Sequence, residues 1–275
     1  MIVGARHVPR ELLPGLVLTL LGMGVAAFAS PVAGQPFQPD PVSETTALVY
    51  WAKPFFPDME ERNPNGSVFG VDLVFPWRPG LSLQIGLPLS VAEPATGGSR
   101  DLRLGNLHVS ALFGETGALS GLVGVTLSTA SNPDGSKFPP GAGAYWTWDE
   151  PEEWSKDGLS IFGAVTPSWA LSGGGRLGLR LGAEAARTKT DDFLLFGRAA
   201  GWGRFPVGTA TLRADLSSSY LLNSDDGFGR QFTAYFVLGA ELSDILAKPG
   251  LFVRVPLDGE ARRFLDFAVG LSARL

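Results

Sequence analysis

Apolar and polar residues alternate along most of this chain, in runs of about ten residues that begin near residue 45. In one such run Leu83, Ile85 and Leu87 alternate with small or polar residues. Successive side chains of a β-strand point to opposite faces, so this period of two predicts strands. No segment after residue 34 sustains the 3.6-residue period of an amphipathic helix. The pattern therefore predicts an all-β domain.

Twelve runs share this alternation, and we predict a strand for each. They are 45–53, 67–77, 81–91, 101–113, 118–129, 159–171, 176–187, 193–204, 208–222, 230–242, 250–257 and 264–275. Within the fourth run the apolar face changes from Leu102 and Leu104 to Leu107 and Val109. This one-residue shift predicts a β-bulge at Gly105-Asn106.

The connections between these runs alternate in length. Tight turns are predicted at 78–80, 114–117, 172–175, 205–207 and 243–249. Longer loops are predicted at 54–66, 92–100, 130–158, 188–192, 223–229 and 258–263. Outer-membrane barrels have short turns at one end and long loops at the other, whereas the Greek-key connections of soluble sandwiches do not sort in this way. We predict a single antiparallel up-and-down transmembrane β-barrel of about 12 strands, whose two ends lie at the short-turn, periplasmic side.

The charged side chains concentrate on one face of the predicted strands. An arginine at mid-bilayer on the lipid side costs roughly 2–4 kcal/mol, so this face is expected to point into the lumen. The predicted lumen-lining residues are Arg103, His108, Ser110, Arg180, Glu184, Arg198, Arg213, Asp215, Arg254 and Asp266. We expect the arginines to pair with carboxylates such as Glu184, Asp215 and Asp266. A large soluble barrel or sandwich with an apolar core stays open as the alternative.

Composition narrows the function classes. Charged residues make up 18% of the chain, below the roughly 25% of ordinary soluble domains. The net charge is −5 and no basic stripe is visible, which argues against a nucleic-acid partner. With no Cys and two His, the chain lacks the side chains for a disulfide framework, a thiol nucleophile or a Cys- or multi-His metal site. We predict no cofactor and no metal.

The first 34 residues have the pattern of a cleavable secretory signal. Arg6 and Arg10 precede the apolar run 16–29, and small residues at 27–29 or 32–34 provide two cleavage sites. The apolar run is shorter than the ~20 residues of a membrane-spanning helix. The predicted organisation is a signal peptide over 1–34, a short periplasmic segment over 35–44, and an outer-membrane barrel over 45–275.

Two further features favour a lipid environment. Trp51, Phe75, Trp77, Trp169 and Trp202 lie near run ends, where an aromatic girdle is expected, although soluble sheets place aromatic residues there too. Alternating apolar residues over 267–275 resemble the C-terminal assembly signal of outer-membrane barrels, which usually ends in an aromatic residue rather than a leucine. The resemblance implies outer-membrane lipid and the barrel-assembly machinery as partners.

The stretch Leu102-Arg-Leu-Gly-Asn-Leu-His-Val-Ser-Ala-Leu-Phe113, with its Gly-rich partner Leu122-Val-Gly-Val-Thr-Leu127, resembles a known family. The family comprises outer-membrane transporters named for the meta-pathway of phenol degradation. Members of the family share a Gly-Asp/Asn-Leu-x-x-(Gly/Ser)-x-x-(Tyr/Phe) strand. The resemblance of this chain to the family covers residues 66–130. The resemblance implies a barrel that passes small hydrophobic or aromatic compounds, and it assigns no catalytic or binding residues.

A hydrolytic alternative rests on His108 and Ser110. Outer-membrane phospholipases also have twelve strands and carry a His and a Ser two residues apart, which places both side chains on one strand face within reach of each other. Asn106 could complete a triad. However, the following Asn-Gly of that family is absent, and both residues fall on the predicted lumen face rather than the lipid side. We therefore predict no catalytic residues.

The segment 130–158 combines a cluster of five carboxylates over 149–157 with Trp146, Trp148 and Trp154. It fits a solvated acidic loop at the barrel mouth, and a calcium- or ligand-capturing lid is the alternative. Taken together, the sequence predicts a passive outer-membrane channel for a small-molecule solute. A barrel with a structural or surface-interaction role is the main alternative, and an outer-membrane lipid hydrolase is a weaker one.

Overall fold

The computed structural model describes residues 44–55, 66–92, 101–114, 119–130, 157–187, 193–223, 232–259, 262 and 265–275. The predicted signal peptide, the periplasmic segment up to residue 43 and residues 131–156 lie outside the described residues. Of the described residues, none belongs to a helix long and apolar enough to cross a membrane.

The described residues form strands that follow the predicted runs closely. They are β1 (Thr46–Phe55), β2 (Ser67–Arg78), β3 (Leu81–Ala92), β4 (Asp101–Leu104), β5 (Leu107–Gly114), β6 (Leu119–Leu127), β7 (Leu159–Ala170), β8 (Arg176–Arg187), β9 (Leu194–Val207), β10 (Ala210–Leu221), β11 (Phe232–Leu242), β12 (Pro249–Pro256) and β13 (Phe267–Arg274).

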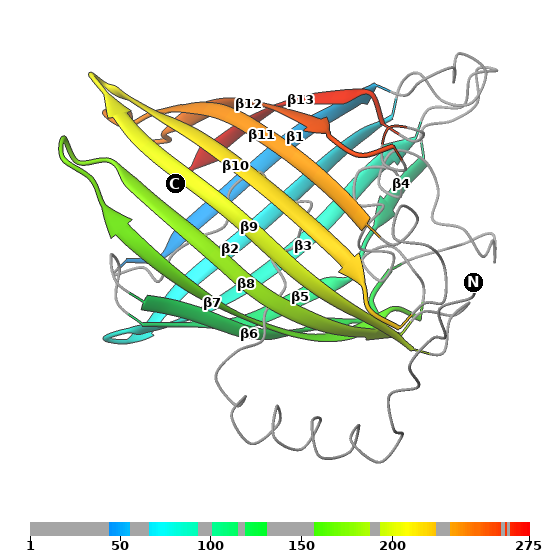
Figure 1. Cartoon of the computed structure of the whole chain (residues 1–275). Coiled ribbons are helices and arrows are strands. Elements are labelled where there is room, and N and C mark those ends of the chain that lie inside the picture. The colour runs from blue at the N-terminus through cyan, green and yellow to red at the C-terminus, as the bar shows by residue number, and fades with distance from the viewer. Residues whose placement is uncertain are drawn as a thin grey trace, which may run out of the picture.

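Strand pairing closes the sheet into a barrel (Figure 1). Strands adjacent in the sequence pair antiparallel, and β1 pairs with both β2 and β13. Both β4 and β5 pair with β3, so together they form one wall strand. The result is a closed twelve-strand, up-and-down antiparallel barrel, which confirms the predicted fold class and leaves no sandwich of two packed sheets. Closure removes the unpaired edges that an open sheet exposes.

The start of β1 and the end of β13 both lie at the short-turn end of the barrel, as predicted. Ala47 and Leu275 exchange two backbone hydrogen bonds of 3.0 and 2.8 Å, and the Arg274 N–H donates to Ala247 in the β11–β12 turn. The C-terminus accordingly lies at the end where the β7–β8 and β9–β10 hairpins turn (Figure 1). Tight hairpins need positive φ, which Gly80 and Gly208 supply at +72° and +60°.

The predicted bulge is present at Gly105-Asn106. Gly86 pairs with His108, while Leu89 pairs with Leu104, so three residues of the β4–β5 wall strand face two residues of β3. Gly105 and Asn106 are both buried, whereas elsewhere buried and less buried residues alternate along this strand. The extra residue returns the following side chains to their proper faces.

The two faces of the wall have opposite chemistry. Interior positions include buried charged residues, whereas the exterior carries large apolar side chains exposed to the surroundings. Representative exterior residues are Leu104, Leu119, Val123, Ile161, Leu181, Leu216, Leu238, Leu251 and Leu271, each 40–59% exposed. A soluble barrel would bury these side chains and expose the charges. The exterior therefore has the surface expected of a protein that contacts an apolar medium.

Aromatic side chains ring both ends of this exterior. Phe75, Trp77 and Trp169 are exposed at the short-turn end. At the opposite end Phe55 and Phe267 stack with ring centroids 4.5 Å apart. Of the predicted girdle residues, Trp202 does not belong to this exterior set. It is 9% exposed and lies on the inner face of β9, because it shares the parity of the inward residues.

Candidate functional site

The barrel interior is the candidate site, and its charged residues come from strands far apart in the sequence. Arg103, Arg180, Arg198, Arg213 and Arg254 are 1–6% exposed, and they lie on β4, β8, β9, β10 and β12. Buried charge is costly unless it is paired and hydrogen-bonded, so the arrangement of partners decides whether such an interior is stable.

One arginine pairs with a carboxylate that the sequence identified. The Nη2 of Arg198 donates to Glu184 Oε2 at 2.6 Å across the β8–β9 pair. The Arg198 guanidinium also lies 5.2 Å from the ring centroid of Phe196. Charge-assisted hydrogen bonds of this length are among the stronger ones in proteins. This contact ties two neighbouring strands together through their inward side chains.

A second ion pair uses Glu241, a carboxylate that the alternation places on the polar, inward face of β11. Arg213 Nη2 donates to Glu241 Oε1 at 2.9 Å, and Arg274 Nε lies 3.5 Å from Glu241 Oε2. The inward parity of Glu241 on β11 was visible in the sequence, but the register that brings it to Arg213 was not. Asp215 lies within electrostatic reach of Arg180 and Arg213.

Asp266 has a different position from the other predicted lumen residues. It is exposed and lies one residue before β13, where its N–H donates to the Phe55 carbonyl at the long-loop end. The buried inner face of this strand begins at Ala268. Asp266 is thus outside the buried interior, because the strand starts later than the alternation in the sequence indicated.

A polar network occupies the inner face of β2, β3 and β5. The Ser110 hydroxyl donates to Gln84 Oε1 at 3.2 Å, and Gln84 Nε2 donates to Asp72 Oδ1 at 3.1 Å. His108 Nδ1 is 3.0 Å from the Thr126 hydroxyl on β6. His108 and Ser110 therefore share the inner face of β5, as predicted. Ser110 is bonded to β3 and His108 to β6, the two strands on either side of β5.

Asn106, the third member of the possible triad, has a structural role at the bulge. Its Oδ1 accepts hydrogen bonds from the backbone N–H groups of Thr129 and Ala130, at 2.7 and 2.6 Å. Its Nδ2 donates to the Gly158 carbonyl at 3.4 Å. This fully buried amide thereby joins the two ends of the 130–158 connection. Such commitment to backbone groups disfavours a catalytic role for Asn106.

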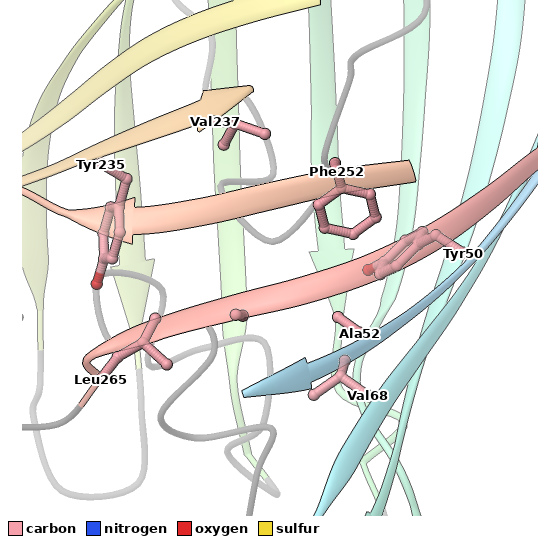
Figure 2. Packing of buried hydrophobic residues seen from close by; sticks show 8 residues of the cluster. Tyr50, Ala52, Val68, Tyr235, Val237, Phe252 and Leu265 are labelled. Atoms are coloured by element: carbon pink, nitrogen blue, oxygen red, sulfur yellow. The ribbon is translucent and has the colours of Figure 1, made fainter. Parts of the chain in front are cut away.

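An apolar sector lies beside the polar network on the inner face of the barrel, and both include residues of β2 (Figure 2). Its buried members come from β1, β2, β11, β12 and β13 and from a position two residues before β13: Tyr50, Ala52, Val68, Tyr235, Val237, Phe252, Leu265 and Ala268. The Arg254 guanidinium lies 3.9 Å from the Tyr235 ring centroid, a cation–π contact within this sector. A second buried apolar cluster comes from β2, β5, β6 and β7: Val74, Leu112, Leu122, Phe162 and Ala164. Apolar clusters and polar contacts therefore lie side by side in the interior.

The interior shows no arrangement for a bound metal within the described ranges, since no three His, Cys, Asp or Glu residues lie together there. The candidate calcium-binding segment, 130–158, lies outside the described residues except at its two ends. The described interior offers charged arginine and carboxylate groups, hydroxyl groups and apolar side chains.

Comparison with solved structures finds the same fold in one with a TM-score above 0.5. An outer membrane channel from Pseudomonas putida F1 superimposes with a TM-score of 0.56 at 15% identity, covering 86% of this chain and 97% of that chain. LpxR from Salmonella typhimurium gives 0.48 at 9% identity, covering 84% and 99%. The translocator domain of autotransporter NalP from Neisseria meningitidis gives 0.45 at 12%, covering 96% and 93%. No family model and no curated protein sequence matches the chain.

Proposed function

We propose that this protein is an outer-membrane β-barrel that acts as a passive channel for small molecules. The observation that carries the proposal is the inverted distribution of side chains, with buried arginines and carboxylates inside and exposed leucines outside. An apolar exterior is stable in contact with hydrocarbon. Barrel closure pairs the backbone N–H and C=O groups of every strand, so no open strand edge faces the lipid. The aromatic side chains at both barrel ends fit the two membrane interfaces.

The channel function is supported by the size and chemistry of the interior. A twelve-strand barrel is wider than an eight-strand barrel, whose side chains fill its interior, and narrower than a sixteen-strand porin. Inward arginines and aromatic rings occupy this interior, so a solute has to be small. The apolar sector around Phe252 favours hydrophobic or aromatic solutes. The outer membrane channel from Pseudomonas putida F1 has a similar fold, which supports this proposal.

Uptake by proteoliposomes tests the proposal. The protein would be refolded into phospholipid vesicles, and swelling would be followed with small neutral and aromatic solutes. We expect swelling faster than that of empty vesicles, and slower swelling as the solute grows. If the protein inserts and no solute passes faster than through empty vesicles, the channel function fails. A structural or surface-interaction barrel then becomes the better assignment.

A further inference from the structure

Leu265 is a large apolar residue that lies outside the strands and is nevertheless fully buried. It stands between β12 and β13, at the long-loop end of the barrel, and is 0% exposed. Large apolar side chains in comparable places are exposed: Leu257, just after β12, by 44%, and Phe193, just before β9, by 55%. Residues that connect strands ordinarily lie on the surface. The burial of Leu265 therefore shows that its side chain packs against another part of the molecule.

The surface that buries Leu265 is the inner face of the barrel. Leu265 belongs to the apolar sector together with Tyr235 and Ala268, and the strand members of this sector occupy inward positions (Figure 2). Continued alternation along β13 would instead place Leu265 outward, on the side of Phe267. However, Asp266 and Phe267 are both exposed, so the alternation is broken at Asp266. The chain turns there and directs Leu265 into the barrel.

Hydrogen bonds fix the chain on both sides of Leu265. The Ala234 N–H donates to Asp258 Oδ2 at 2.7 Å, which ties the chain to β11 just after β12 ends. The Asp266 N–H donates to the Phe55 carbonyl at 2.9 Å, which ties the chain to β1 just before β13 begins. Leu265 is adjacent to the second of these contacts. Its backbone is therefore held beside the inner face at the long-loop end.

Three large inward side chains follow one another from the long-loop end toward the middle of the barrel. Strand register places Tyr235 first, Arg254 next and Phe252 last. The Arg254 guanidinium lies 3.9 Å from the Tyr235 ring centroid, and all three residues are 1% exposed. Solvent accordingly does not reach this file of side chains, although the file begins at the end of the barrel where Leu265 lies.

We propose that Leu265 is the size-determining residue at the long-loop entrance to the apolar sector, and that solutes enter the barrel past it. Tyr235 and Phe252 belong to strands that are paired on both sides, so their backbones are fixed. Leu265 lies outside the strands, and its displacement breaks no strand pairing. A shorter side chain at this position would widen the entrance and admit larger solutes. This inference rests on the proposed channel function and names the residue that sets its size limit.

Cysteine labelling tests the entrance independently of transport. The chain contains no cysteine, so an introduced thiol is the only one present. Val68→Cys places this thiol on the inner face of β2, at a position of the apolar sector that is 0% exposed. Refolded protein in detergent would be treated with a charged, water-soluble thiosulfonate. We expect labelling about tenfold faster or more when Leu265→Ala is added, because truncation of a fully buried leucine removes packing worth more than one factor of ten.

Two further variants calibrate the labelling rate. Leu257→Ala is the matched control, because this leucine lies at the other end of the same connection and is exposed, and it should leave the rate unchanged. Leu246→Cys, at a turn position that is 95% exposed, gives the rate of a freely accessible thiol. If Leu265→Ala does not fold, Leu265→Val provides the test, with a smaller increase expected. Circular dichroism would establish that each variant retains its β-structure.

Vesicle swelling with neutral solutes of increasing size, measured for wild type and Leu265→Ala, separates this inference from the channel function. Faster labelling together with uptake of larger solutes by Leu265→Ala would support both. Faster labelling without uptake by either protein would keep Leu265 as the residue that closes this end of the interior and would reject the channel. An unchanged labelling rate would overturn the inference whatever the vesicles take up. The same holds if Val68→Cys alone is labelled as fast as Leu246→Cys, or if the size limit for uptake does not change.

Discussion

The guanidinium of Arg198 and the carboxylate of Glu184 meet inside the barrel at 2.6 Å, with both side chains no more than 2% exposed. The two residues lie on adjacent strands, so their contact joins β8 to β9 through the interior as well as through the backbone. At this depth each charge is stabilised mainly by its partner. Removal of either partner leaves a buried charge that has lost this ion pair.

We expect Glu184→Gln to lower the free energy of unfolding by roughly 3–5 kcal/mol, the usual cost of breaking a buried pair. Urea unfolding of the refolded protein, followed by circular dichroism, measures this change. The double variant Glu184→Gln with Arg198→Gln should recover part of the loss, because no charge stays buried. A double variant less stable than the single one would show that the pair is not the main interaction of Arg198.

We expect Asn106→Ala to destabilise the barrel by about 1–3 kcal/mol, because the backbone N–H groups of Thr129 and Ala130 lose their acceptor on a fully buried side chain. Asn223→Ala is the matched control. Asn223 also binds backbone groups, at Leu195 and Phe193, but it is exposed and water can replace its amide. Urea unfolding of both variants should show a clearly larger loss for Asn106→Ala. Similar losses would contradict the special role of the bulge.

We expect Gly178→Ala to be destabilising by about 1–3 kcal/mol, since a Cβ there overlaps the indole ring of Trp202 on the neighbouring strand. Gly201→Ala is the control, because no atom lies within 4 Å of the added methyl. That variant should be neutral or slightly stabilising in the same unfolding assay. Adding Trp202→Leu to Gly178→Ala should recover stability, and failure to do so would place the strain elsewhere.

We expect Leu216→Arg to reduce folding into phosphatidylcholine vesicles strongly. Leu216 is 50% exposed at the middle of β10, where an arginine facing lipid costs about 2–4 kcal/mol. Val207→Arg, at the last residue of β9 and 57% exposed, should cost only about 0–1 kcal/mol. The folded fraction after insertion measures both. Equal tolerance at the two positions would reject the membrane environment.

The alternation of residues determined the strands, the inner and outer faces and the bulge. Side chains of a strand change face at every residue, so a charged residue such as Arg180 and an apolar neighbour such as Leu181 are assigned to opposite sides without knowledge of the partners. The one-residue shift at Gly105-Asn106 was visible for the same reason. Short and long connections then indicated an up-and-down barrel, because consecutive strands pair when the turn between them is tight.

The contacts between strands were decided only by the tertiary structure. Register depends on turn geometry and on the bulge, and a shift of one residue exchanges every partner. The sequence therefore identified Arg213 but not Glu241 as its partner, and it did not reveal that Arg176, Arg204 and Arg213 stand side by side. Alternation placed Phe252 on the same face as Arg254, but it could not show that Phe252, Tyr50 and Tyr235 gather into one apolar sector. An aromatic residue is favourable on either face of a barrel wall, and only closure determines which rings meet inside.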